Sequence, residues 1–398
     1  MNLNNIKSKF PVFKKNPNLV FLDTAASSLK VDKMISTTNE CYTNEYANIH
    51  RGNYELSSKL TIKYEDSRTK IANYLNVPSQ NIIFTKSATE GINLISSCMS
   101  SSYFKDHDEI ILSHLEHHAN VIPWHLSSKK IKIVPLEINE DGEIIYEDLK
   151  SKINSNTKLI SLTHMSNVTG SITDINKIKE ISKKYNVPLL LDGCQFAPHK
   201  KVNLRELNPD FYVFSAHKIY GPSGLGILYM KDKWIEKFPP YQGGGQMINE
   251  VFIDKSTYAV GYEKFEAGTP PIAEVVGFSS SIDFMNEVNP EDIYKHEMNL
   301  HDHALEKLKN INNIKFYGNS NNKGAIISFN LEGIHNSDLG SLLDKRNIAI
   351  RTGHHCCQPL MKFFKINGTA RLSFGVYNTL EDVDFFDKSL REVSKILQ

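Results

Sequence analysis

The chain has 398 residues, and its 46 lysines and arginines against 45 aspartates and glutamates give a formal net charge of +1. This balance argues against a nucleic-acid-binding or polyanion-binding protein. The chain is longer than a domain with a single hydrophobic core usually is, so two domains are expected. The N-terminus lacks the apolar stretch of a signal peptide, and no window is apolar enough to span a membrane. We therefore expect a cytoplasmic protein.

Short apolar runs alternate with helical patterns along the first two thirds of the chain. The runs cover residues 82–84, 109–112, 158–162, 187–191, 211–214 and 226–229, and an amphipathic stretch covers 174–185. This alternation predicts βαβ units around a mostly parallel sheet. In such sheets ligands bind beyond the carboxyl ends of the strands.

The pattern changes near residue 283. A long charged helix is expected at 290–310, strands near 325–330 and 370–374, and a terminal helix from 380. We expect a large domain of residues 17–282 and a smaller α+β domain of residues 1–16 and 283–398.

The cysteines form an odd, scattered set without a Cys-x-x-Cys motif: Cys41, Cys98, Cys194, Cys356 and Cys357. That set argues against a disulfide framework. Reduced thiols are expected, with one of them reactive.

Lys218 follows the apolar run 211–214 and precedes a Gly-Pro-Ser-Gly turn. A lysine at the mouth of a buried strand loses solvation, which favours the neutral amine that forms a Schiff base with an aldehyde. A surface lysine at a strand end is the alternative.

Two further features lie where the strand-end rule expects a site. Asp192 directly follows the run 187–191, where a carboxylate suits a cationic partner or caps the next helix; Gln195, three residues on, is expected on the same side. The turn at 85–93 offers free amides and hydroxyls at a helix start, which suit a phosphate or an ordinary cap. Ser215 and His217 are further candidate donors.

Histidines cluster in two segments, at His114, His117 and His118 and at His354–Cys357. Either cluster suggests a metal site. Adjacent residues of an extended segment point in opposite directions, however, and do not easily surround one ion. The extended geometry therefore disfavours a metal site, and an imidazole of the first cluster is suited instead to stack on a flat cofactor ring or to carry a proton.

A lysine, a strand-end carboxylate, a phosphate-type turn and a histidine together suit pyridoxal 5′-phosphate. The segments 215–224, 116–124 and 351–356 resemble motifs of cysteine desulfurases, of the group II (Suf-type) branch of the class V aminotransferase family. The resemblance extends from residue 22 to residue 378. It implies the type I fold of pyridoxal-phosphate transferases, α/β, with a large, mostly parallel seven-stranded sheet domain and a smaller α+β C-terminal domain.

The resemblance assigns roles around the cofactor ring. Lys218 resembles the Schiff-base lysine, Asp192 the partner of the ring nitrogen, Gln195 the donor to the ring hydroxyl, and His117 the stacking and proton-transferring imidazole.

A second group resembles the phosphate ligands of the family. Thr89, Ser215 and His217 match such ligands, whereas Ala88 stands where a hydroxyl residue is usual and leaves its backbone amide. Thr269 matches a residue that reaches the phosphate of the neighbouring subunit, which implies a homodimer.

Asn167 and Arg371 match residues that hold the substrate carboxylate, for which a guanidinium fork is well suited. Arg351 matches an arginine near the same pocket, with a structural ion pair as the alternative. Other positions depart from the family pattern, namely Ala216, Pro271 and Tyr54.

The implied reaction converts L-cysteine to L-alanine and leaves a persulfide on Cys356, the position that matches the family nucleophile. The short stretch from Cys356 to Arg371 limits reach, so we expect a Suf-type acceptor protein to collect the sulfur for iron–sulfur cluster assembly. Cys357 is left with two interpretations, resolving the persulfide or forming a side disulfide. The alternatives are selenocysteine lyase or another pyridoxal-phosphate β-lyase and, more distantly, a metal-binding protein built on His354–Cys357.

Overall fold

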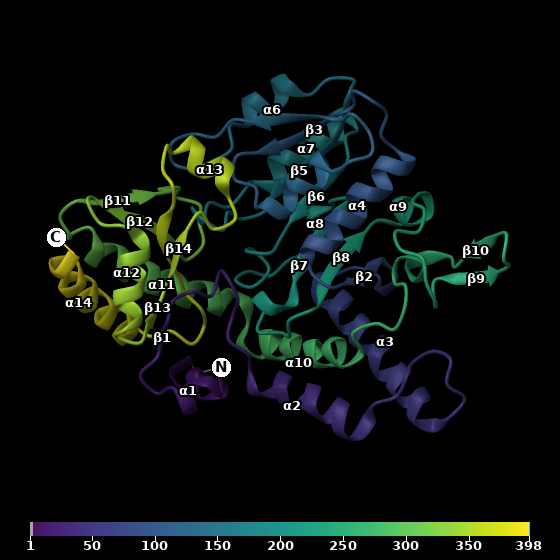
Figure 1. Cartoon of the computed structure of the whole chain (residues 1–398), viewed down its shortest axis with the longest axis horizontal. Coiled ribbons are helices and arrows are strands. Elements are labelled where there is room, and N and C mark those ends of the chain that lie inside the picture. Colours follow the sequence, from purple (N-terminus) through teal and green to yellow (C-terminus); the bar gives the residue numbers. More distant parts are fainter. Residues whose placement is uncertain (1–2, 398) are drawn as a thin grey trace.

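A computed structural model describes residues 3–397 (Figure 1). Its largest element is a seven-stranded sheet of order β2-β8-β7-β6-β5-β3-β4, in which β8 runs antiparallel to both neighbours and the other pairs are parallel. The predicted mostly parallel seven-stranded sheet is confirmed. Its strands are β2 (Ile82–Thr85), β3 (Glu109–Ser113), β4 (Lys132–Leu136), β5 (Thr157–Thr163), β6 (Leu189–Asp192), β7 (Phe211–Ser215) and β8 (Gly226–Met230).

The apolar runs predicted six of these strands, whereas no run indicated β4. This strand lies at the sheet edge, alternates exposed and buried residues, and contains Pro135. Proline is tolerated at an edge because one side of the strand needs no hydrogen-bond donor. The edge position therefore explains why the apolar signal is weak there.

Helices cover both faces of the large sheet, so its strands are apolar on both sides. Ile160 and Leu191 belong to the core on one face, and Leu159 and Leu190 to the core on the other. The associated helices are α2 (Asp32–Glu40), α3 (Glu55–Leu75), α4 (Ala88–Ser102), α5 (Ile122–His125), α6 (Tyr146–Lys152), α7 (Ile175–Tyr185), α8 (Leu204–Leu207), α9 (Asp232–Lys237) and α10 (Ile272–Val288).

The amphipathic stretch at 174–185 forms α7, as predicted. The Asp174 carboxylate accepts hydrogen bonds from the amides of Asn176 and Lys177, which caps the helix start. Asn186 adopts a left-handed conformation and ends the helix.

A second, antiparallel sheet has the order β11-β12-β15-β14. Its strands are β11 (Ile314–Tyr317), β12 (Ile326–Leu331), β14 (Arg351–Gly353) and β15 (Thr369–Ser373). One face packs on α11 (Pro290–Leu308), α12 (Asn336–Asp344) and α14 (Leu380–Leu397) in a separate core. The long helix, two of the strands and the terminal helix agree with prediction within two residues, whereas β11 and β14 were not predicted.

The chain ends and connections join the two sheets. α1 (Val12–Lys15) lies close to the N-terminus, β1 (Val20–Phe21) pairs with β13 (Ile348–Ala349), and α13 (Gln358–Phe363) leads into β15. Phe10 packs edge-on against Tyr220 and Tyr377, which come from the two different regions. This aromatic contact fixes the regions against each other.

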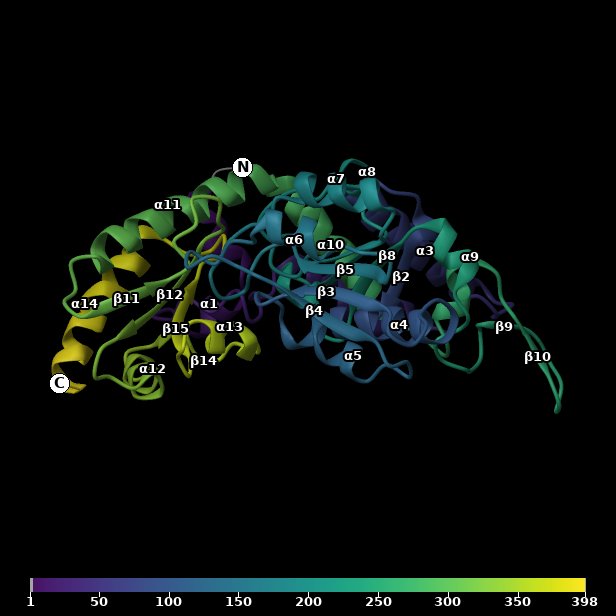
Figure 2. The same cartoon turned by 90° about the horizontal axis from the view of Figure 1, so that it is seen from above.

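A hairpin of β9 (Ile248–Val251) and β10 (Ser256–Tyr258) projects from the large-sheet region, as Figure 2 shows. Across residues 3–397, no helix is both long and apolar enough to cross a membrane.

Candidate active site

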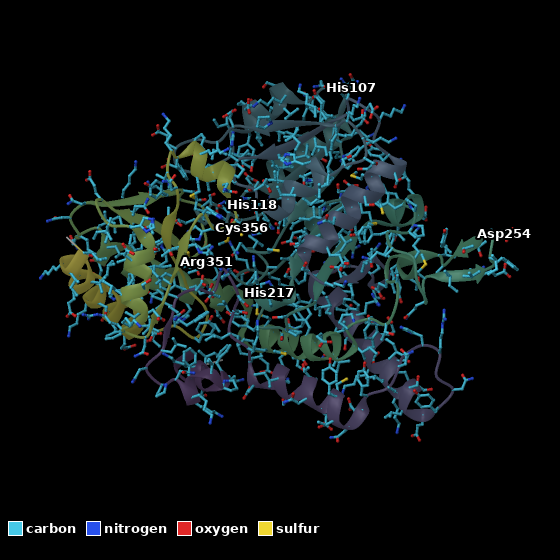
Figure 3. All side chains as sticks on the ribbon, in the orientation of Figure 1. His107, His118, His217, Asp254, Arg351 and Cys356 are labelled. Carbon is cyan, nitrogen blue, oxygen red and sulfur yellow. The ribbon has the colours of Figure 1, made fainter. Side chains whose placement is uncertain are left out.

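A cavity of about 190 Å³ lies between the carboxyl ends of the large-sheet strands and the second sheet. Every sequence-predicted site residue except Thr269 lines it: Ala88, Thr89, His117, Asn167, Asp192, Gln195, Ser215, His217, Lys218, Arg351, Cys356 and Arg371. In Figure 3, Arg351, Cys356, His118 and His217 lie where the two regions meet, whereas His107 and Asp254 lie at the periphery. Residues far apart in sequence therefore share one cavity.

Lys218 ends a short 3-10 turn that directly follows β7. The preceding carbonyl, of His217, accepts hydrogen bonds from the amide and hydroxyl of Ser28 and from Lys30 Nζ. These donors fix the backbone at the strand end. The half-buried Lys218 amine is thereby held at the cavity wall.

Asp192 is the last residue of β6 and pairs in register with Thr163 of β5, which also lines the cavity. Its side chain is buried, and Oδ1 accepts a hydrogen bond from the Cys194 amide at 3.0 Å. Gln195 donates from Nε2 to the Ala25 carbonyl at 2.7 Å, while its buried Oε1 has no protein partner. A buried acceptor without a partner indicates that a ligand group completes the site.

The turn before α4 brings backbone amides to the cavity. Ser215 Oγ accepts from the Ala88 amide at 2.9 Å, and Ser87 Oγ caps the Glu90 amide. The Ser215 hydroxyl hydrogen and the helix start at Thr89 remain available for an anion. Gly226 lies so close to Ser87 that a Cβ there would meet backbone atoms at 2.3 Å, so glycine permits this approach.

His117 presents a neutral imidazole to the cavity. Burial, followed by the Lys218 charge, lowers its pKa to about 4. Its Nδ1 accepts from the Ala119 amide at 3.1 Å, so the neutral ring carries its proton on Nε2. The ring can therefore donate from Nε2 and offer its face to a planar ligand.

The sequence did not indicate which residue supports this histidine. Glu116 is fully buried; its carboxylate accepts from Ser113 Oγ and Asn120 Nδ2 at 2.6 Å and from the Thr163 amide at 3.1 Å. Burial raises its pKa to about 7. The glutamate thus ties the His117 segment to the end of β5. In the sequence, the available signal for this role was a charged residue within an otherwise apolar and histidine-rich motif.

Two arginines line the cavity from neighbouring strands, since Arg351 of β14 and Arg371 of β15 are register partners. Arg371 is buried and binds Asp23 Oδ1 at 3.0 Å and the Asn167 carbonyl at 2.9 Å, while its Nε has no partner. Arg351 is exposed and forms no ion pair within the described chain. Like charges placed side by side suit an anionic group such as a carboxylate.

Asn167 plays a part that the sequence did not indicate. Its Nδ2 donates to the His355 carbonyl at 2.7 Å, next to Cys356. Asp23, the partner of Arg371, lies at the start of the stretch that resembles the family, but the sequence assigned it no role.

Cys356 lies on a turn of unusual backbone conformation, with φ values of 51° at His355 and 54° at Cys356. Two successive left-handed residues that are not glycine are strained and persist only where contacts hold them. The Cys356 carbonyl accepts from the His118 amide at 2.7 Å, and the Cys356 amide donates to His354 Nδ1 at 3.1 Å. The turn presents a half-buried thiol to the cavity.

Cys357 faces the opposite way. It is buried, and its Sγ lies 3.3 to 3.8 Å from the carbonyl oxygens of His114, Leu115 and Glu116. Burial raises the pKa of this thiol strongly. In this geometry Cys357 is a structural thiol, which argues against both interpretations that the sequence left open.

The same divergence affects the metal-binding alternative. His355 Nε2 bonds to Thr369, whereas Cys357 points beneath the His114 segment. Within residues 3–397, no group of three or more histidine, cysteine, aspartate or glutamate side chains is arranged to hold an ion. The four consecutive residues 354–357 do not form a ligand set.

Thr269 lies outside the cavity. It is exposed and lines a separate hollow together with Glu90, Tyr241 and Gly268. Within its own chain it therefore does not reach the other predicted phosphate ligands.

Comparison with known proteins places this geometry in a family. The aminotransferase class-V model matches residues 20–386. A protein named cysteine desulfurase from Wigglesworthia glossinidia brevipalpis is 41% identical, covering 99% of this chain and 98% of its own, and a probable cysteine desulfurase from Halalkalibacterium halodurans is 39% identical, covering 99% and 98%. The apo structure of a cysteine desulfurase from Thermococcus onnurineus NA1 superimposes with a TM-score of 0.94 at 32% identity, covering 98% of both chains.

Proposed function

We propose that this chain, which belongs to the class-V aminotransferase family, is a pyridoxal-phosphate-dependent cysteine desulfurase. The observation that carries the proposal is that Lys218 and Asp192 share one cavity with the thiol of Cys356. An amine and a carboxylate alone suit many amino-acid transformations. The thiol adds an acceptor for sulfur.

The residues present fit pyridoxal 5′-phosphate. Lys218 would attach the cofactor, Asp192 would pair with the ring nitrogen, and the partnerless Oε1 of Gln195 is available to the ring hydroxyl. The Ala88–Thr89 turn with Ser215 and His217 would hold the phosphate, and His117 would lie on the ring. When bound, the cofactor stores the electron pair left after the substrate Cα proton departs.

The chain's own residues account for the remaining chemistry. Arg371 and Arg351 bind the substrate carboxylate, and Lys218 Nζ accepts the Cα proton. Cys356 Sγ attacks the substrate sulfur as a thiolate; an S–S bond forms, the Cβ–S bond breaks, and Cβ gains a proton. In sum, L-cysteine and the Cys356 thiol become L-alanine and a Cys356 persulfide.

The sulfur then leaves through a partner. Cys356 is half-buried on a constrained turn, and α13 follows two residues later. A thiol with so little freedom favours delivery by exchange with an acceptor cysteine brought to it. We assign this role to a Suf-type acceptor protein in cytoplasmic iron–sulfur cluster assembly, in agreement with the five free cysteines.

The assembly proposed is a homodimer of chains that each divide into a large domain (17–282) and a small domain (1–16 and 283–398). The exposed position of Thr269, outside its own cavity, supports a role at the phosphate of a partner subunit. A monomeric protein with full activity would contradict the dimer.

The test is alanine and sulfide formation from L-cysteine by wild type and Cys356→Ala. We expect the variant to keep the cofactor absorbance and lose sulfur transfer. If the variant is as active as wild type, Cys356 is not the nucleophile and a β-lyase reaction is favoured.

A further inference from the structure

A second cavity lies in the small-sheet region and shares no lining residue with the cavity of Lys218 and Cys356. It measures about 500 Å³ and is bounded by α11, by β11 and β12, and by the segment 318–324. Figure 2 shows α11 running along these strands. Four of its lining side chains are apolar, namely Met298, Leu305, Phe316 and Ile327, and its polar lining includes His301, Asp302 and Lys323.

His301 supplies a buried acceptor to this cavity. The side chain is 3% exposed, Nδ1 lies 2.8 Å from Asp302 Oδ1, and the buried Nε2 has no partner. An ionised carboxylate only accepts hydrogen bonds, so Nδ1 carries the proton. Burial, followed by the charge of Lys323, lowers the pKa of the imidazole. The neutral ring of this cavity-lining residue therefore has a bare lone pair on Nε2.

Lys323 supplies a cation beside it. Its Nζ donates to the Gly318 carbonyl at 2.8 Å, and no carboxylate of residues 3–397 lies within salt-bridge distance of it. Burial lowers its pKa to about 8, while Asp302 partly restores it. Lys309 adds a second, exposed cation at the rim. A half-buried ammonium with one neutral partner is poorly compensated and would be stabilised by an anion.

We propose that this cavity binds the phosphate group of a small molecule, with Lys323 pairing with an anionic oxygen and His301 Nε2 accepting the P–OH hydrogen. Close to its second ionisation, at about pH 6, a phosphate monoester is partly in the singly protonated form, which carries both kinds of oxygen. A sulfate has no such hydrogen, so its oxygens would face the His301 lone pair with repulsion. The apolar lining side chains accommodate the organic part of a phosphate monoester.

The cavity is joined to the segment that carries Asn167. The Gly324 amide donates to the Gly170 carbonyl at 2.8 Å, and the Ile172 amide donates to the Asn322 carbonyl at 2.8 Å. Gly318, with φ of 87°, packs where a Cβ would meet Thr169 at 2.3 Å. The cavity-lining segment 318–324 is therefore tied directly to the segment 165–172.

The test is titration calorimetry on protein saturated with pyridoxal phosphate, so that phosphate sites in the large cavity are filled. Inorganic phosphate and phenyl phosphate distinguish free phosphate from a monoester, and sulfate is the matched anion without a proton. We expect saturable binding of phenyl phosphate and weaker binding of sulfate. Lys323→Met should weaken binding about tenfold or more, the effect of one lost charge-assisted hydrogen bond.

Lys315→Met is the control. This substitution removes the same charge, but Lys315 is exposed on β11 and does not line the cavity. It should bind as wild type does. His301→Phe should abolish the preference for phosphate over sulfate, with folding of each variant checked by circular dichroism. Absence of saturable binding in wild type, or an equal loss in Lys315→Met and Lys323→Met, would overturn the proposal.

Discussion

The two sheets supply the cavity in different ways. The large sheet contributes Asp192 and Lys218 at or just beyond the ends of the neighbouring strands β6 and β7. The small sheet contributes Arg371 from the face of an antiparallel strand and Cys356 from a left-handed turn. Strand ends of a parallel sheet come together through topology alone. A face contributes only if its register is correct, and a strained turn only if contacts hold it.

The chemistry divides along the same line. In the proposed reaction, cofactor attachment and proton transfer belong to the large sheet, whereas carboxylate binding and sulfur capture belong to the small sheet. Substitutions in the large-sheet region should therefore impair cofactor attachment and proton transfer, whereas those in the small-sheet region should impair substrate binding and sulfur capture. The size of each effect tests this division of roles between the two sheets.

Lys218→Ala should produce the largest effect. Without the amine, alanine formation from L-cysteine should fall about 10³-fold or more, the scale of a lost general base together with lost attachment. The absorbance of the bound cofactor should also change. The surface substitution Lys183→Ala, on α7, is the control. Normal turnover by the Lys218 variant would contradict the assignment of cofactor attachment and proton transfer to the large sheet.

The arginine pair should show graded effects. In Arg371→Met, kcat/KM for L-cysteine should fall about 10²-fold, because a buried, hydrogen-bonded cation is lost and Asp23 is left without its partner. Arg351→Met should cost about fivefold, since Arg351 is exposed. Steady-state kinetics of the two variants give the comparison, and equal losses would show that burial does not set their contributions.

Stability in acid should reveal buried neutral imidazoles in both regions. Burial lowers the pKa of His164 to about 3 and that of His355 to about 2, from 6.5. The unfolded chain then binds protons that the folded chain excludes, so the free energy of unfolding falls as pH drops below 6.5. Each imidazole should cost about 2 kcal/mol between pH 6.5 and 5.

Urea unfolding of wild type and His164→Gln across this range measures the effect. The free energy of unfolding of the variant should fall less steeply with decreasing pH than that of wild type, because the variant lacks the imidazole that is protonated only in the unfolded chain. Parallel curves would show that His164 is not protonated on unfolding.

Cys357→Ala should have the smallest effect. Its Sγ is buried against backbone carbonyls, so activity should stay within about threefold of wild type while unfolding requires about 1 kcal/mol less. Turnover and thermal melting measure both. A large loss of sulfur transfer with unchanged stability would restore the resolving role of this thiol.

The same contrast explains what the sequence could predict. Asp192 and Lys218 follow uninterrupted apolar runs, so the sequence predicted their strands and a site beyond the carboxyl ends of those strands. The edge strand β4 and the short strand β14 lacked that signal, and the Glu116 and Asp23 contacts depend on tertiary packing. The cysteine was identified only through resemblance, because no local pattern announces two left-handed residues in a row.

The most direct test of the division is the mass of the Cys356 peptide after a single turnover with L-cysteine and no acceptor. Wild type should gain one sulfur atom on Cys356 for each alanine released, Lys218→Ala should gain none, and Cys357 should stay unmodified. A sulfur atom found on Cys357, or alanine released without any gain at Cys356, would contradict the account.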